Sequence, residues 1–143
     1  MMRLRLNGLL FVCIIALTTV LSGCGNEKSQ SIALQQVRLE STSSLIDSGK
    51  APFKEQTFSA PNELVLFKRM LDEAEPREGK LDYAPMFNVE VTFVDGGSKQ
   101  YYMAIDPSAE LRGLLVEAAD SEQGYTIDTK QSSELSRLIY GVQ

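Results

Sequence analysis

The clearest pattern in the chain is an alternation of apolar and polar side chains that begins after Pro85. Its apolar positions are Phe87, Val89, Val91 and Phe93. Such alternation is typical of a strand that buries one face. The turn residues Asp-Gly-Gly-Ser follow at 95–98, and residues 99–105 are expected to return as the partner strand. The segment therefore predicts an antiparallel hairpin.

A helical period replaces this alternation in two other segments. In residues 62–75 the apolar face of a 3.6-residue spiral consists of Leu64, Phe67, Met70, Leu71 and Ala74. Ser59 or Asn62 can cap this helix, and Pro76 is expected to stop it. The terminal helix has the apolar face Leu135, Leu138 and Ile139, a cap at Ser132 or Ser133, and Gly141 as its stop.

Shorter runs complete the set of predicted strands: 32–40, 53–58, 114–116 and 125–127. Pro52 suggests an edge position for the second of them, and the polar residues between 41 and 50 are typical of loops. The order is strand, strand, helix, hairpin, strand, strand, helix. It predicts one α+β domain, with a mostly antiparallel sheet packed against two helices.

The amino terminus follows a different pattern, with Arg3 and Arg5 before an apolar run at 9–21 and then Leu-Ser-Gly-Cys at 21–24. This is the layout of a secretory signal. The small residues before Cys24 resemble the lipobox of bacterial lipoproteins, which implies cleavage between Gly23 and Cys24 and a diacylglyceryl thioether on Cys24. The alternatives are an uncleaved membrane helix and a plain signal that frees the protein. The run has 13 residues, which falls short of the roughly 20 that a spanning helix needs.

Three parts are therefore predicted: a signal peptide at 1–23, the lipidated Cys24 with a flexible tether at 24–30, and a single domain at 31–143. Two acyl chains on one cysteine give the two anchors that stable attachment requires. We expect the protein at the cell membrane, lipid-anchored on the extracytoplasmic face.

Composition narrows the function classes. Removal of the signal takes Arg3 and Arg5 away, so 12 of the 14 basic residues remain against 19 acidic ones, a net charge of −7. That charge disfavours nucleic acid as a partner. The chain has no histidine, and its other cysteine, Cys13, lies in the signal. The mature domain then has no free thiol, no disulfide and no thiolate metal site.

No motif indicates catalysis. The densest acidic stretch comprises Asp72, Glu73, Glu75, Glu78 and Asp82. Basic residues are interleaved with it, and the alternating carboxylates of a calcium loop are missing, so it indicates a solvated helix end. Without histidine a serine hydrolase would need a Ser–Lys dyad, and Ser98-Lys99 stands where the predicted turn ends. We therefore predict a non-enzyme without metal or cofactor.

Three tyrosines are the candidate partner-binding residues: Tyr101, Tyr102 and Tyr125. Neighbouring residues of a strand point to opposite faces, so one of Tyr101 and Tyr102 should be in the core and the other exposed. An exposed tyrosine on the sheet could anchor a partner.

These positions carry a resemblance to a known family. The chain resembles the small YhfM-type lipoproteins of Firmicutes in its lipobox, its helix face, its hairpin and its last strands and helix. The matching residues are Cys24, Phe67, Met70, Leu71, Ala74, Val89, Val91, Tyr101, Tyr102, Gly113-Leu114-Leu115, Tyr125-Thr126-Ile127, Leu135 and Leu138. It departs at Ala104, where the family often has tryptophan. The resemblance implies a membrane-anchored extracytoplasmic domain and brings no catalytic residues.

We expect a lipoprotein with a small non-catalytic interaction or sensor domain. Its partners would be the membrane, through the lipid on Cys24, and an envelope protein, peptide or other component. The alternative is a solute-binding or inhibitor module, for which a closed apolar pocket would be characteristic.

Overall fold

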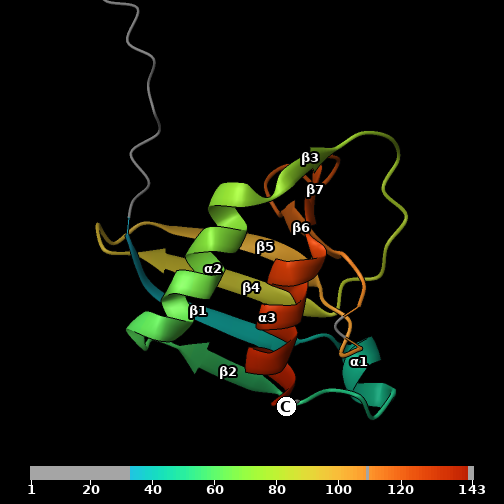
Figure 1. Ribbon diagram of the computed structural model, residues 1–143, viewed down its shortest axis with the longest axis horizontal. Helices are drawn as coiled ribbons and strands as arrows, with labels where there is room; N and C mark the ends of the chain where they lie inside the picture. The colour runs from blue at the N-terminus through green and yellow to red at the C-terminus, as the bar shows by residue number, and fades with distance from the viewer. Residues whose placement is uncertain (1–32, 109, 142–143) are drawn as a thin grey trace, which may run out of the picture. The chain divides into compact units, whose positions relative to one another are not determined.

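Seven strands form one antiparallel sheet in a computed structural model that describes residues 33–108 and 110–141 (Figure 1). The strands are β1 (Leu34–Ser41), β2 (Glu55–Phe58), β3 (Glu75–Arg77), β4 (Phe87–Phe93), β5 (Ser98–Ala104), β6 (Gly113–Glu117) and β7 (Gly124–Ile127). Their spatial order is β2-β1-β4-β5-β6-β7-β3, and every neighbouring pair is antiparallel. The predicted signal peptide, the cleavage site at Cys24 and the tether lie outside the described residues.

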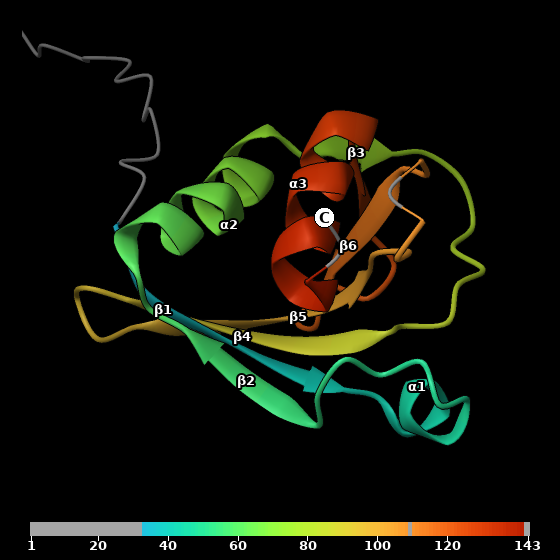
Figure 2. The same ribbon diagram turned by 60° about the horizontal axis from the view of Figure 1, so that its bottom comes forward.

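Three helices accompany the sheet: α1 (Ser43–Asp47), α2 (Pro61–Glu73) and α3 (Thr129–Tyr140). The two longer helices, α2 and α3, lie on the same side of the sheet (Figure 2). The α+β class and the antiparallel sheet are thus confirmed, and the structure adds α1 and β3 to the predicted elements. No helix in the described part of the chain is long and apolar enough to cross a membrane.

The core lies between the sheet and these two helices. Alternate residues of the central strands form the layer of the core on the sheet: Val37, Leu39, Phe87, Val89, Val91, Tyr101, Met103 and Leu115. Phe67 and Met70 from α2 and Leu135 and Ile139 from α3 pack onto this layer. The alternation of the hairpin and the periodicity of both helices therefore predicted the buried faces correctly.

Helix ends differ from the prediction. No side chain of Ser59 or Asn62 caps α2, because the helix begins at Pro61 and Glu63 accepts a hydrogen bond from the Ala60 N–H at 3.1 Å. The helix ends at Glu73, before Pro76 is reached.

The start of α3 also differs from the prediction. This helix begins at Thr129, and its cap is Asp128 in place of Ser132 or Ser133. The Asp128 carboxylate accepts a hydrogen bond from the Gln131 N–H at 2.8 Å. Its end is as predicted: Gly141 has a φ of 65°, the left-handed conformation that glycine adopts most easily.

One end of the other sheet face is also covered. Leu114 and Val116 of β6 are buried but do not belong to the core under the helices. Leu81, from the segment before β4, lies on this face, because a Cβ on Gly124 would be 2.6 Å from its Cδ2 and Gly124 is the register partner of Val116. Over β2, β1, β4 and β5, by contrast, the side chains on this face are exposed or half-buried, so the face is open there.

Candidate binding surface on the open sheet face

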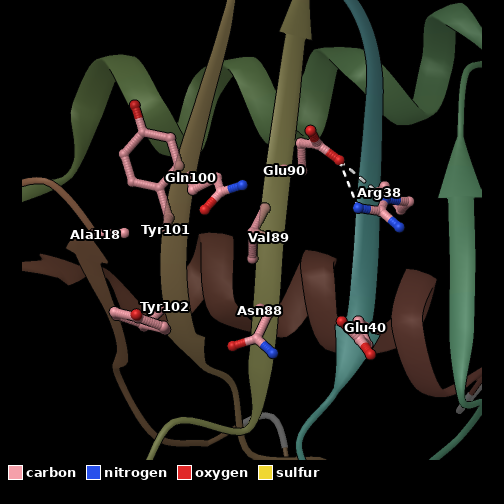
Figure 3. A pocket seen from close by; sticks show the side chains of 9 residues that line it. All are labelled: Arg38, Glu40, Asn88, Val89, Glu90, Gln100, Tyr101, Tyr102 and Ala118. Atoms are coloured by element: carbon pink, nitrogen blue, oxygen red, sulfur yellow. Dashed lines mark hydrogen bonds and ion pairs between the residues drawn. The ribbon is translucent and has the colours of Figure 1, made fainter.

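The register of β1, β4 and β5 brings polar side chains together on the open face. Glu40 pairs with Asn88, and Asn88 pairs with Tyr102, so these three form one row across the strands. The next row is Arg38, Glu90 and Gln100. Figure 3 shows the two rows side by side, with the helices behind the sheet.

These two rows border a hollow of about 290 Å³ that is partly open to solvent. Val89, Tyr101 and Ala118 also line it. The side chains of Val89 and Tyr101 belong to the core, so the backbone of β4 and β5 forms the floor. We call this feature the open-face hollow.

Arg38 is held in place by two carboxylates. Its Nε and Nη2 donate to Glu90 Oε2 at 3.0 and 2.7 Å, and its Nη1 donates to Glu55 Oε2 at 3.2 Å. The hydrogen bond to Glu90 and the negative charges of Glu90 and Glu55 raise the pKa of Arg38. Because both charges face the guanidinium, Arg38 offers little free positive charge to a ligand.

The other polar side chains of the hollow differ from Arg38 in their contacts, although the charge of Glu40 also acts on Arg38. Within the described residues, the side chains of Glu40, Asn88, Gln100 and Tyr102 make no hydrogen bond or ion pair. Glu40, Asn88 and Gln100 are exposed, whereas Tyr102 is half-buried. The hollow thus presents two amides, a phenol and a carboxylate, which together can donate and accept hydrogen bonds.

The structure divides the three candidate tyrosines between two faces. Tyr102 lies on the open face, whereas Tyr101 is buried in the core, as the strand alternation predicts for neighbours. Tyr125 packs against the core and lies near Tyr101, together with Leu71 and Leu115. Burial is the main cause that raises the pKa of Tyr101 to about 12, with smaller contributions from Glu117 and Tyr125. Tyr102 is therefore the candidate that lines the open face with its ring.

Sequence reasoning did not single out Glu40, Asn88 or Gln100. A signal for them exists, because Arg38 and Glu40 alternate with the buried Val37 and Leu39 along β1. That alternation identifies a polar face within one strand. It does not say which residues of a distant strand lie beside it.

The acidic stretch near the end of α2 takes part in separate local contacts. Asp72 pairs with Lys68 at 2.6 Å, and Glu73 accepts from the Gln131 side-chain amide at 2.5 Å. In the described residues no group of three or more histidine, cysteine, aspartate or glutamate side chains could hold a metal ion.

Comparison with known families adds the identity of the domain. The model of the YhfM protein family matches residues 27–143. The chain belongs to this family. The match confirms the predicted YhfM resemblance and spans every residue of the open-face hollow. No curated protein and no solved structure matches the chain significantly.

Proposed function

We propose that this protein is a lipoprotein anchored through Cys24 at the extracytoplasmic face of the membrane, with a non-catalytic interaction or sensor domain. The observation that carries the proposal is the contrast between the two sheet faces. One face is covered by α2 and α3, and the other presents a hollow with four polar side chains that make no hydrogen bond to the described part of the chain. We infer that an envelope component binds there.

The charges of the hollow favour binding over catalysis. Hydrolysis by a carboxylate pair needs one group that can give up a proton near neutral pH. Glu90 is engaged as an anion by Arg38, with 2.7 Å between Oε2 and Nη2. Glu40 would then act without a second carboxylate in the hollow to serve as the acid.

The alternative, a solute-binding or inhibitor module, is less well supported. Small solutes are usually enclosed by mostly apolar walls. The open-face hollow is partly open and its rim is polar. These properties suit a larger ligand that lies across the sheet.

The anchor is tested by metabolic labelling of the full-length chain with palmitate. We expect the wild type to be labelled and to sediment with membranes, because diacylation of Cys24 supplies two acyl chains. Cys24→Ala should carry no label. Cys13→Ala is the matched control, since Cys13 lies in the predicted signal, and it should be labelled like the wild type. A labelled Cys24→Ala variant or an unlabelled wild type would refute the anchor.

The interaction surface is tested by photo-crosslinking in intact cells. A photoreactive residue at Gln100 should give adducts with an envelope component, and Asn88→Ala should reduce them. The control position is Gln56, which is exposed but pairs with the buried Leu39 and so faces the helix side. Equal adducts from both positions, or none from Gln100, would contradict an interaction role for the open face.

A further inference from the structure

We infer that the open-face hollow binds a neutral, hydroxyl-rich glycan. This inference rests on the proposed interaction function and names the class of ligand. Three properties of the hollow carry it: an aromatic ring set beside polar groups, the hydrogen-bonding character of those groups, and the local charge.

Tyr102 supplies the aromatic surface. Its side chain is half-buried, and its register partners are Asn88 on β4 and Val116 on β6. Val116, beside it on β6, is buried, and Tyr83 lies close enough for the two phenols to interact electrostatically. A half-buried ring loses less conformational freedom on binding than a fully exposed one. The apolar C–H face of a sugar can pack on such a ring while the sugar hydroxyls stay at its edge.

The polar groups match hydroxyls. The Asn88 and Gln100 amides each donate and accept, the Tyr102 phenol does both, and Glu40 accepts. Sugar hydroxyls also donate and accept, so each can pair with either kind of group. Two strand spacings separate Glu40 from Tyr102, about 10 Å, a row long enough for two linked sugar rings.

The charges argue against an anionic ligand. Arg38 already faces Glu90 and Glu55, and Glu40 adds a further negative charge beside them. Among the residues that line the hollow, Arg38 is the sole cation and is paired with two carboxylates, so a phosphate or uronate polymer would meet a net negative charge there.

The geometry also argues against an extended peptide. Peptides that bind sheets commonly pair with free backbone groups at a sheet edge. In the hollow, the backbone of β1, β4 and β5 is already paired with neighbouring strands. Recognition here must come from side chains above the sheet, which suits a glycan better than a peptide strand.

The test is binding of defined oligosaccharides to the purified full-length chain in a detergent without a sugar headgroup. The neutral probes are tetra-N-acetylchitotetraose and cellotetraose, the anionic probe is a hyaluronan tetrasaccharide, and the peptide probe is tetralysine. Calorimetry or ligand-observed NMR gives the Kd. We expect at least one neutral probe to bind and the hyaluronan probe to bind at least about tenfold more weakly.

Variants locate the site. Tyr102→Ala should weaken binding at least about tenfold, because it removes the aromatic surface. Asn88→Ala and Gln100→Ala should each weaken it about fivefold through one lost hydrogen bond. Both residues are exposed, so these variants keep the test valid if Tyr102→Ala does not fold. Gln56→Ala, the same change on the other face, should leave the Kd unchanged.

Several outcomes would overturn the inference: no binding of either neutral probe, binding that is insensitive to Tyr102, Asn88 and Gln100, or tighter binding of hyaluronan or tetralysine. Photo-crosslinking separates this failure from that of the proposed function. Position-specific adducts at Gln100 without oligosaccharide binding would support the interaction role and contradict a glycan as the ligand.

Discussion

Phe67→Ala is expected to lower the free energy of unfolding by about 3–5 kcal/mol. Phe67 is fully buried and extends from α2 toward the sheet, where its ring centroid lies 5.2 Å from that of Phe58 on β2. Truncation removes most of a large buried side chain and leaves a cavity between the helix and the strand. Since small domains are stabilised by about 5–15 kcal/mol in total, the variant would lose a large part of its stability.

Phe67 is also one end of a series of aromatic contacts. The series runs through Phe67, Phe58, Phe53, Phe87 and Tyr140, with ring centroids 5.2–6.4 Å apart at each step. It connects α2, β2, β4 and α3 on the helix side of the sheet. Loss of the Phe67 ring therefore also weakens the packing of the short edge strand β2 against α2.

The measurement is equilibrium denaturation by urea, followed by far-UV circular dichroism because the chain has no tryptophan. Val65→Ala on the same helix is the control. Its side chain is 55% exposed, and its loss should change stability by no more than about 0.5 kcal/mol. If Phe67→Ala cost less than about 1.5 kcal/mol, α2 would not be fixed to the sheet by this contact.

Elements with a clear period were predictable from the sequence. Helix α2 and the β4–β5 hairpin were predicted because their apolar residues recur at helical and strand spacing over a full element. The helix α1 was missed because it has five residues and one buried side chain, Leu45, which is too little for a period. The strand β3 was missed because it contains Pro76, a residue that disfavours strands. A proline is tolerated at this position because β3 lies at the sheet edge.

The start of α3 shows how tertiary contacts decide between equivalent local signals. Asp128, Ser132 and Ser133 are all good caps. Asp128 takes the role, and Ser132 is instead buried, where its Oγ accepts from the Gly113 N–H at 2.7 Å. Its partner is 19 residues away, so no local pattern could reveal this contact.

The open-face hollow was predictable only in part for the same reason. The alternation around Tyr101 and Tyr102 predicted opposite faces, and the structure confirms it. The row of Glu40, Asn88 and Tyr102 depends on the register between β1, β4 and β5. Register between distant strands is set by how their buried faces fit together, and one strand's sequence does not contain it.

Gly113→Ala is expected to destabilise the domain by about 1–3 kcal/mol. A Cβ there would lie 2.6 Å from the Ile105 Cδ1, 3.0 Å from the Ser132 Oγ and 3.1 Å from the Ile127 Cδ1. All three neighbours are buried, so they have little room to move away. Urea denaturation measures the loss, and Gly97→Ala is the control, because Gly97 lies in an exposed turn beside the carboxylate of Asp95.

A double-mutant cycle with Ser132 tests whether the Ser132 hydroxyl contributes to the crowding at Gly113. Ser132→Ala alone should cost about 1–3 kcal/mol, because it leaves the buried Gly113 N–H without its acceptor. In the double variant, the missing hydroxyl makes room for the new methyl group, so the combined loss should be smaller than the sum of the two single losses. Additive losses would instead mean that the methyl group is opposed by Ile105 and Ile127 alone, and that Ser132 does not contribute to the requirement for glycine at the start of β6.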